Sequence, residues 1–399
     1  MRILLSNKFY YRRGGDCIYM LNLEQLLREH RHETAVFAMD YPENLDTPWK
    51  RYFPQNMSKL MALTRPFGSI EVKKKFNKLL DDFRPDVVHL NNIHTHLSPI
   101  IAELAHKRGI RVVWTLHDYK LLCPRYDCLR GDKTICELCF DGNKKPCLAN
   151  KCMKGSALAS WVGYKEAVMW NRKRLESCTD AFVCPSLFMA EKMEQGGFDK
   201  RKLKVMCNFI DVGKCRKDDY SRDEYYCFIG RLSHEKGAET LIEAASQLPY
   251  KLKVIGGGPL NEELRMKSEG LGGNIEFLGF KQWDEIKDIA GRAKFSVIPS
   301  EWYANNPLSV IEAQCLGTPV LGARIGGIPE LIDEGVSGMT FASGSADDLK
   351  NKIECMYNAT FDYQQIAQKA MERYNAEVYY KEISNLYVGS EYCEESSKH

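Results

Sequence analysis

The stretch FSVIPSEWYANNPLSVIEAQCLGTPV at residues 295–320 decides how the second half of this chain folds. Its apolar start, FSVIP, indicates a buried strand, and the polar SEWYANN that follows indicates a loop. The helical pattern PLSVIEAQCL then ends at Gly317 and Pro319, before another apolar run. A strand, a loop, a helix and a second strand in this order predict a parallel βαβ unit.

The same alternation extends over the whole chain of 399 residues. The other strand-like runs are RILLS, ETAVFAM, PDVVHLNN, RVVWTLHD and DAFVCPS in the first half, and EYYCFIG, KLKVIGG, NIEFLGF and GMTFA in the second. We therefore expect an α/β fold of two Rossmann-like domains that face each other across a central cleft. The first domain is expected at 1–205, with a cysteine-rich loop at 120–155, and the second at 223–370, after a linker at 206–222. A C-terminal helix and tail at 371–399 is expected to cross back to the first domain.

Composition places the chain among ordinary globular proteins, with 44% hydrophobic and 27% charged residues. No run of about 18 apolar residues predicts a membrane-spanning helix, and the N-terminal apolar run is too short for a signal peptide. Fifteen cysteines without such a peptide predict a reduced, cytoplasmic protein. Residues 1–222 carry 39 Lys and Arg against 26 Asp and Glu. This excess indicates either an anionic partner for the first half or an uneven solvated surface.

Two glycine-containing turns in the second half follow predicted strands. GRLSHEKG at 230–237 opens a helix, whose N-terminus offers free N–H groups, and Arg231 and Lys236 add two full positive charges. This combination suits a diphosphate without a metal ion, and an ordinary surface loop with solvated charges is the alternative. VIGGGP at 254–259, with Gly257 inside it, leaves room for a flat base or a ribose against the backbone, as many βα turns do.

The loop and helix at 300–313 supply a second anion site. Five consecutive residues provide the cap of the helix and its free backbone N–H groups: Asn305, Asn306, Pro307, Leu308 and Ser309. We expect one of the two asparagines to cap the helix and the proline to lie in its first turn. Glu312 lies more than a turn inside, where a carboxylate accepts the two hydroxyls of a ribose. A buried and paired structural glutamate is the alternative.

Two further motifs, RRGGD at 12–16 and TLHD at 115–118, belong to predicted strand ends in the first half. Paired glycines let backbone N–H groups approach a phosphate, although a plain tight turn is by itself the simpler explanation. Together with FLGF at 277–280 and GGIPELI at 326–332, all these motifs resemble the retaining glycosyltransferases of family 4, of the cell-surface polysaccharide type, which have the GT-B fold. The resemblance covers nearly the whole second half and is looser in the first.

The resemblance implies a hexosyltransferase-type enzyme that moves a sugar from a nucleotide donor with retention and needs no metal at the donor site. Arg231 and Lys236 would hold the diphosphate and stabilise the charge of the leaving group, and His117 would touch the donor sugar. The implied donor-binding residues are Gly14, Gly15, Gly257, Leu278, Asn305, Asn306, Pro307, Leu308, Ser309 and Glu312. The chain contains no Asp-x-Asp motif, as this resemblance implies.

The chain departs from the family pattern at one position. The pattern has two glutamates separated by seven residues; the second is Glu312 and the first falls at Ala304, which cannot hydrogen-bond a sugar. Glu301 is three residues out of register. The alanine is either a natural variant or an engineered removal of the glutamate, and the intact remainder of the site favours the second interpretation. We therefore expect a chain that binds donor and turns over slowly.

Six cysteines lie close together in the sequence, at positions 123, 128, 136, 139, 147 and 152. Cys136 and Cys139 form one short-spaced pair, and Cys147 and Cys152 form another, as a tetrahedral structural zinc site needs. Disulfides formed on exposure to oxidant and unligated thiols are the alternatives. No cofactor is expected for catalysis.

A UDP-sugar is the expected donor, with a GDP-sugar second, and the expected acceptor is a glycan or a lipid-linked glycan. Basic stretches at 72–78, 120–154 and 171–174 suit the anionic inner face of a membrane and leave a peripheral location there open, although a solvated basic surface explains them equally. Nothing resembles a nucleic-acid-binding module. Two other functions stay open: a sugar-nucleotide epimerase on the same fold, and a donor-binding pseudo-enzyme that serves as an assembly partner.

Overall fold

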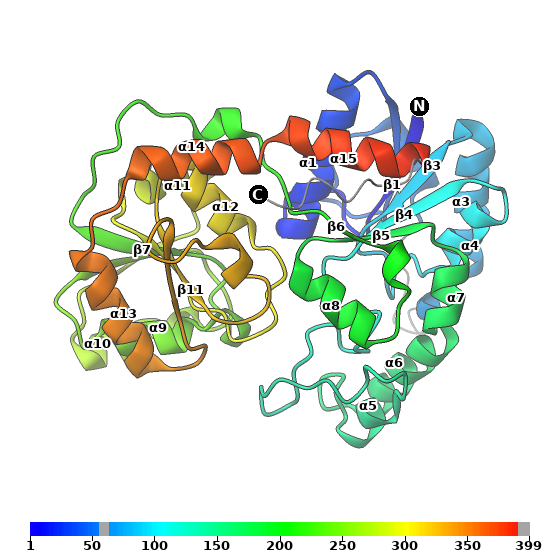
Figure 1. The fold of residues 1–399 in the computed structure, drawn as a ribbon. Helices are drawn as coiled ribbons and strands as arrows, with labels where there is room; N and C mark the ends of the chain where they lie inside the picture. Colours follow the sequence, from blue (N-terminus) through cyan, green and yellow to red (C-terminus); the bar gives the residue numbers. More distant parts are fainter. Residues whose placement is uncertain (56–63, 390–399) are drawn as a thin grey trace. The chain divides into compact units, whose positions relative to one another are not determined.

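The computed structural model describes residues 1–55 and 64–389 and divides the chain into two compact units (Figure 1). Unit 1 comprises Met1–Cys207 and the C-terminal segment from Glu377, and unit 2 comprises Asn208–Ala376. Each unit contains a six-stranded sheet with helices around it, so the expectation of two Rossmann-like domains is confirmed. The end of the predicted tail, residues 390–399, lies outside the described residues.

The sheet of unit 1 is entirely parallel, in the order β2-β1-β3-β4-β5-β6. Its strands are β1 (Arg2–Ser6), β2 (Glu33–Phe37), β3 (Val87–Leu90), β4 (Arg111–Thr115), β5 (Ala181–Cys184) and β6 (Leu203–Val205). Its α-helices are α1 (Gly15–Glu29), α3 (Ile70–Phe83), α4 (Ile100–His106), α5 (Lys145–Ala149), α6 (Ala157–Met169), α7 (Arg172–Ser177), α8 (Leu187–Gln195) and α15 (Ala376–Val388). Strands β3 and β5 are buried at every residue, as expected for parallel strands covered on both faces.

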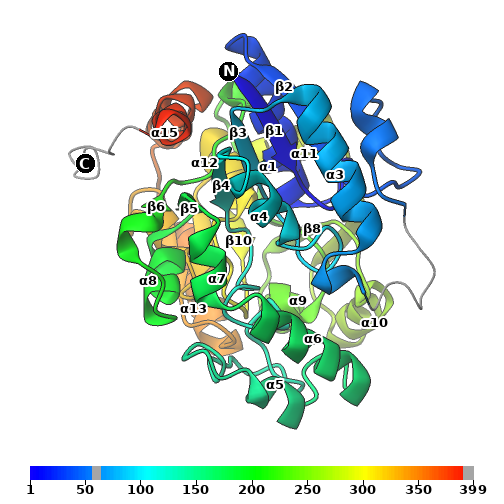
Figure 2. The ribbon, with the colours of Figure 1, turned by 90° about the vertical axis from the view of Figure 1, so that its right-hand side faces the viewer.

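The strand order of unit 1 reverses its direction at β1. The chain moves from β1 outward to β2 and then returns to β3 on the other side of β1. Right-handed crossovers therefore place α1 and α3 on opposite faces of the sheet, and α3 packs beside α4 (Figure 2). Ligands of such sheets bind outside the carboxyl ends of the strands at this reversal point.

Helix α15 packs on unit 1 beside α1 through a buried polar cluster (Figure 1). The hydroxyl of Tyr387 lies 2.6 Å from Nδ1 of His89, and Nε2 of the same histidine lies 2.8 Å from the hydroxyl of Thr115. The hydroxyl of Tyr19 bonds to both Thr115 and Tyr379. The cluster therefore ties the C-terminal helix to α1, β3 and β4.

The sheet of unit 2 is also parallel, in the order β12-β11-β10-β7-β8-β9, and it reverses at β7. Its strands are β7 (Tyr225–Ile229), β8 (Lys251–Ile255), β9 (Ile275–Gly279), β10 (Ser296–Ile298), β11 (Val320–Ala323) and β12 (Gly338–Phe341). Its α-helices are α9 (Ala238–Ala245), α10 (Asn261–Leu271), α11 (Trp283–Arg292), α12 (Leu308–Cys315), α13 (Ala346–Asn358) and α14 (Tyr363–Arg373). The reversal places the loops after β7 and β10 side by side at the carboxyl edge.

The unit boundaries lie at Cys207/Asn208 and Ala376/Glu377. Most of the predicted linker, residues 208–222, therefore belongs to unit 2, and so does α14, part of which was assigned to the C-terminal tail. No described helix is long and apolar enough to cross a membrane.

Candidate functional site

The loops after β7 and β10 are pressed together in unit 2. Gly237, at the start of α9, has φ +66°, and a Cβ there would lie 1.7 Å from the carbonyl oxygen of Pro299. The backbone N–H of Glu301 donates to the carbonyl oxygen of Glu235, at 3.1 Å. Only glycine permits this approach, so the glycine of the GRLSHEKG motif fixes the helix start against the end of β10.

Two cations in the β7 loop have no ion-pair partner in the described part of the chain. Arg231 is exposed, and Lys236 is partly buried with its Nζ 5.2 Å from the ring centre of Trp302. Burial lowers the pKa of Lys236; Glu235 raises it, and Arg231 lowers it further. Two uncompensated positive charges beside a helix start are an arrangement that an anion stabilises.

The turn after β8 packs backbone to backbone against the β7 loop. A Cβ at Gly256, where φ is +127°, would lie 2.0 Å from the carbonyl oxygen of Gly230, and one at Gly258 would lie 2.3 Å from that of Leu232. These two glycines are needed for packing. Gly257 differs, because nothing lies within 4 Å of the position of its Cβ. Of the three glycines, Gly257 therefore has room for a ligand.

The predicted cap of α12 is wrong. We expected Asn305 or Asn306 to cap this helix with Pro307 in its first turn, but Pro307 is itself the N-cap residue and no side chain caps the helix. Asn306 instead holds the chain before the 3-10 helix η4 (Val212–Cys215). Its Oδ1 accepts from the backbone N–H of Asn208 at 3.1 Å, and Nδ2 of Asn208 donates to its backbone carbonyl oxygen at 2.8 Å.

The start of α12 therefore keeps unsatisfied groups. Within residues 1–55 and 64–389, the backbone N–H groups of Leu308 and Ser309 have no acceptor, and the Glu312 carboxylate makes neither a hydrogen bond nor an ion pair. Glu312 is partly buried, and burial raises the pKa of its carboxyl to about 7. The alternative of a paired structural glutamate finds no support, because no described residue forms the hydrogen bond or ion pair that would offset the lost hydration of this group.

Ala304 lies in the loop between β10 and α12 and is only 3% exposed. Its carbonyl oxygen accepts from the N–H of Gly327 at 2.8 Å, and a Cβ at Gly326, where φ is +60°, would lie 2.2 Å from the same oxygen. The GGIPELI motif thus fixes the backbone of position 304. Glu301, which is out of register, accepts a hydrogen bond from the hydroxyl of Thr240 on α9 and so points toward that helix.

His117 follows β4 in unit 1. Its Nε2 lies 2.9 Å from Oδ1 of Asn91, and the edge of Tyr19 packs on its ring with the centroids 4.9 Å apart. Burial lowers the pKa of His117 to about 4, against the opposing effect of Asp16. The imidazole is therefore neutral at pH 7, and because Asn91 Oδ1 only accepts, Nε2 carries the proton and Nδ1 remains an acceptor.

The two glycines of the RRGGD motif lie at the start of α1. Gly14 is the N-cap residue in an extended conformation, and nothing lies within 4 Å of a Cβ at Gly15. Neither has positive φ, so the backbone does not require glycine. A Cβ at Gly14 would lie 3.5 Å from Oδ1 of Asp16, so only Gly15 leaves open space. Asp16 accepts from Nδ2 of Asn92 at 2.9 Å, which joins the loops after β1 and β3.

Sequence reasoning missed the residues that support these groups. Asn91 and Asn92 hold His117 and Asp16, Trp302 lies against Lys236, and Asn208 anchors the α12 loop. A signal existed for the first two, since a polar pair directly after the apolar run VVHL marks the carboxyl end of a strand next to the reversal point. The predicted base contact, Leu278, is partly buried in β9.

The cysteine-rich loop forms thiol pairs within unit 1. Cys123 accepts a hydrogen bond from the thiol of Cys128, which lowers the pKa of Cys123 to about 7, and the free thiol of Cys147 donates a hydrogen bond to Cys152. Burial raises the pKa of Cys139 to about 12. Across the described residues, no group of three or more His, Cys, Asp or Glu side chains is placed to hold a metal ion. The arrangement gives no support to zinc, which stays a prediction that metal analysis of the purified protein tests.

Models of known protein families match both units of the chain. A family model described as Glycosyltransferase Family 4 matches residues 13–214, and one described as Glycosyl transferases group 1 matches residues 216–373. The chain belongs to glycosyltransferase family 4. The resemblance seen in the motifs is thereby confirmed over both halves of the enzyme.

Relatives and solved structures agree with this assignment. The glycosyltransferase is 27% identical over 353 residues to an uncharacterized 42.6 kDa protein in the cps region of Klebsiella pneumoniae, covering 83% of this chain and 87% of the relative. It is 29% identical over 394 residues to an uncharacterized glycosyltransferase of Methanocaldococcus jannaschii, with 94% of each chain covered. Its fold matches Anabaena HepE, solved with UDP-glucose, with TM-score 0.68 and 18% identity over 98% of this chain and 100% of that one.

Proposed function

We propose that this glycosyltransferase moves a sugar, with retention, from a UDP-sugar to a glycan or lipid-linked glycan acceptor in surface polysaccharide synthesis. One observation carries the proposal: Arg231, Lys236 and Glu312 have no ion-pair partners in the described chain. The two cations lie in the loop after β7, and Glu312 lies in the second turn of α12, which follows β10 in the same sheet. A nucleoside diphosphate complements all three, because its phosphates pair with the cations and its ribose diol donates to the carboxylate. HepE with UDP-glucose supports the donor class, and the relative in a cps region supports the acceptor class.

The reaction needs charge stabilisation more than proton transfer by the protein. The bond between the sugar C1 and the β-phosphate oxygen breaks, the acceptor oxygen bonds to C1 on the same face, and the acceptor proton leaves to the released diphosphate. Arg231 and Lys236 stabilise the negative charge that grows on that diphosphate, in the role that a metal ion has in other transferases. In unit 1, His117 presents Nδ1 as an acceptor for a hydroxyl of the donor sugar.

Titration calorimetry with UDP, UDP-glucose and GDP tests the donor half of this proposal. We expect the Arg231→Ala and Lys236→Ala variants each to bind UDP about 10- to 100-fold more weakly, since a hydrogen bond to a charged group contributes about 1.5–3 kcal/mol. The matched control is Lys281→Ala in the same unit, whose ammonium pairs with Glu285 at 2.8 Å on the surface. Absence of UDP binding by the unaltered chain, or equal losses in all three variants, would contradict the proposal.

One observation favours a second candidate, the donor-binding pseudo-enzyme: position 304 carries an alanine where the family pattern has a carboxylate. The two candidates separate when the Ala304→Glu variant is incubated with UDP-sugars and glycan acceptors. Transfer to the acceptor supports the transferase, and UDP binding without turnover supports the pseudo-enzyme. An isomerised donor without acceptor would instead indicate an epimerase.

A further inference from the structure

The buried polar cluster that holds helix α15 also reaches the candidate residue His117. The hydroxyl of Tyr19 bonds to that of Thr115, at 3.1 Å, and to that of Tyr379 on α15. The ring of Tyr19 in turn meets the His117 ring edge to face, with the centroids 4.9 Å apart. One side chain of α1 therefore joins the C-terminal helix to the histidine that follows β4.

The His117 ring needs two constraints to present its free nitrogen in one direction. The hydrogen bond from Nε2 to Oδ1 of Asn91, at 2.9 Å, fixes one end of the ring. That bond alone lets the imidazole turn about the axis that joins the two atoms, because a single hydrogen bond tolerates a broad range of ring orientations. The ring of Tyr19 blocks this rotation by packing against the imidazole with 65° between the ring planes. Asn91 and Tyr19 together therefore fix the direction of Nδ1.

Helix α15 is attached to unit 1 at two points. Tyr379 and Tyr387 are separated by eight residues and so lie on one face of the helix, with the buried Ile383 between them. The hydroxyl of Tyr387 lies 2.6 Å from Nδ1 of His89, and that of Tyr379 bonds to Tyr19. A helix that packed through aliphatic side chains alone could slide along its neighbours, whereas these two contacts fix its register.

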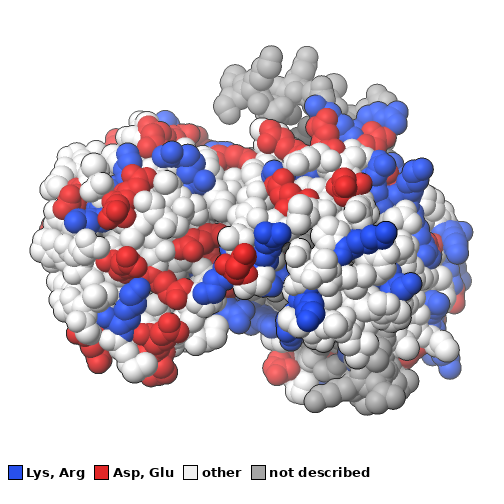
Figure 3. Space-filling model, turned by 90° about the horizontal axis from the view of Figure 1, so that it is seen from below, with Lys and Arg blue, Asp and Glu red and all other residues white. Residues whose placement is uncertain are grey.

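The cluster differs in kind from the charged surface of the protein. Lys, Arg, Asp and Glu side chains are spread over the face that Figure 3 shows. Burial lowers the pKa of His89 to about 3 and raises that of Tyr19 to about 12, so both are neutral at pH 7. A buried polar network in which the groups satisfy one another fixes one arrangement of its members. The members are neutral and at most 4% exposed: Tyr19, His89, Thr115, Tyr379 and Tyr387.

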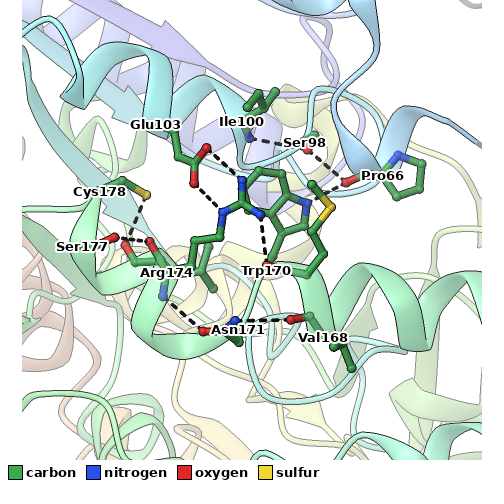
Figure 4. A network of polar contacts seen from close by, with 12 residues as sticks. Pro66, Ser98, Ile100, Glu103, Val168, Trp170, Asn171, Arg174, Ser177 and Cys178 are labelled. Atoms are coloured by element: carbon green, nitrogen blue, oxygen red, sulfur yellow. Dashed lines mark hydrogen bonds and ion pairs between the residues drawn. The ribbon is translucent and has the colours of Figure 1, made fainter.

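A second polar network in unit 1 has no such connection (Figure 4). Trp170 donates from Nε1 to the carbonyl oxygen of Pro66 at 2.7 Å, and Arg174 of α7 forms a bidentate pair with Glu103 of α4. Within the described part of the chain, none of these four residues bonds to His117 or to the α15 cluster. This comparison network therefore shows what polar contacts that only hold the fold look like.

We propose that Tyr19 is a positioning residue for His117, and that Tyr379 of the C-terminal helix positions Tyr19 in turn. Helix α15 thus contributes to the transfer reaction through two side chains, in addition to holding unit 1 together. The inference rests on the proposed function in one respect, which is that Nδ1 of His117 accepts from a hydroxyl of the donor sugar.

Nitrogen NMR of the full chain with labelled histidine tests this inference without any substrate. His117 should give the signals of one neutral tautomer, with the proton on Nε2, and the His117→Gln variant identifies these signals. In Tyr19→Leu the ring is free to turn, so signals of the second tautomer, with the proton on Nδ1, should appear. Tyr379→Phe removes one oxygen atom and retains the packing of its ring, and it should produce the same change to a smaller extent.

Turnover with a UDP-sugar and a glycan acceptor gives a second readout. Tyr19→Leu should lower turnover about 100-fold, because a misplacement of about 1 Å at a reacting group costs about this factor, and its affinity for UDP should be unchanged. Tyr19→Phe and Tyr379→Phe remove the same hydrogen bond, so each should lower turnover about fivefold. The double variant should also lose about fivefold and not about 25-fold, since two changes to one interaction are not additive.

Two control variants separate positioning from stability. Trp170→Phe removes the hydrogen bond to Pro66 in the comparison network. Tyr380→Phe changes the same helix α15, where it removes a hydroxyl that lies 2.7 Å from Nε2 of His32. Both variants should melt at a lower temperature than the unaltered chain, and both should keep its His117 tautomer and its turnover.

Three results would overturn the inference: a single tautomer in Tyr19→Leu, losses that multiply in the double variant, or equal losses in the two controls. Failure of the proposed function has a different signature. An unaltered chain that binds UDP and transfers no sugar in any variant would contradict the transferase, whereas the tautomer of His117 in Tyr19→Leu and Tyr379→Phe would still decide the positioning role.

Discussion

We expect the substitution Glu312→Gln to raise the free energy of unfolding and to lower the affinity for UDP, because the Glu312 carboxylate has no partner among the described residues. Burial raises the pKa of this carboxyl from its ordinary value of 4.5 to about 7. Between these values the folded protein holds a proton that the unfolded chain releases. The free energy of unfolding therefore falls as pH rises through this window, and the full loss is present above pH 7. A glutamine is always neutral and escapes this loss.

The magnitude follows from the pKa. A rise from 4.5 to about 7 corresponds to about 3 kcal/mol, since each tenfold change in proton affinity is about 1.4 kcal/mol. We therefore expect the stability advantage of Glu312→Gln over the unaltered chain to grow by about 2–3 kcal/mol as the pH rises from 5 to 8. In melting temperature of unit 2 this is about 5–10 °C. UDP affinity should fall about 10- to 100-fold at the same time, because the amide cannot accept both ribose hydroxyls as a carboxylate does.

The assay is thermal and urea denaturation of both proteins at half-unit steps of pH without ligand. Ser309→Ala is the matched control, because it changes the same helix without removing a titratable group, and its difference from the unaltered chain should be independent of pH. A Glu312→Gln difference that stays constant from pH 5 to pH 8 would refute the account of Glu312 as a desolvated acid.

Three further outcomes are expected. Ala304→Glu should raise turnover by about 10²–10³, the usual effect of one polar transition-state contact, and an unchanged rate in transfer assays would remove the case for this position. Gly237→Ala should lower the free energy of unfolding of unit 2, measured in urea, by more than about 2 kcal/mol, because its Cβ would meet a backbone oxygen at positive φ. Gly257→Ala has open space for its Cβ, so it should leave this free energy unchanged and weaken UDP-sugar binding. Tyr387→Phe should reduce stability by about 1–3 kcal/mol by leaving Nδ1 of His89 unpaired; circular dichroism melts showing no change would contradict the role of the α15 cluster.

The fold could be predicted from the sequence because parallel strands that are buried on both faces are continuous apolar runs. Runs such as VVHL and AFVC are short, β-branched or aromatic, and bounded by polar residues, so their type and order are determined locally. Strand β6 (Leu203–Val205) escaped prediction because it lies at the sheet edge and has one buried residue of three. The unit assignment of α14 escaped for another reason, since this helix is amphipathic and only tertiary contacts decide which sheet it covers.

The site could be predicted from the sequence where a motif constrains the backbone. It could not be predicted where one side chain has several possible hydrogen-bond partners. The glycine that ends GRLSHEKG lies at a turn, as its motif indicates, because only glycine tolerates a backbone oxygen 1.7 Å from the position of its Cβ. The cap of α12 was predicted wrongly, since an asparagine beside a helix start caps it only when no other donor competes, and the backbone of Asn208 competes for Asn306. That competitor lies 98 residues away along the chain, where no local pattern shows it.

The candidate polar groups of the two units differ in whether they have partners within the protein. In unit 1 the candidate groups are already partnered, with His117 on Asn91 and Asp16 on Asn92, so this unit offers fixed orientation and a neutral imidazole. In unit 2 the cations of the β7 loop and Glu312 have no ion-pair partner among the residues that the structure describes, which leaves their electrostatic interactions available to a ligand. Affinity for the nucleotide is therefore expected to depend on unit 2, and correct placement of the sugar on unit 1. This division predicts that Asn91→Ala lowers turnover while leaving the affinity for UDP unchanged, and a parallel loss of UDP binding in calorimetry would show that the two units do not act in this way.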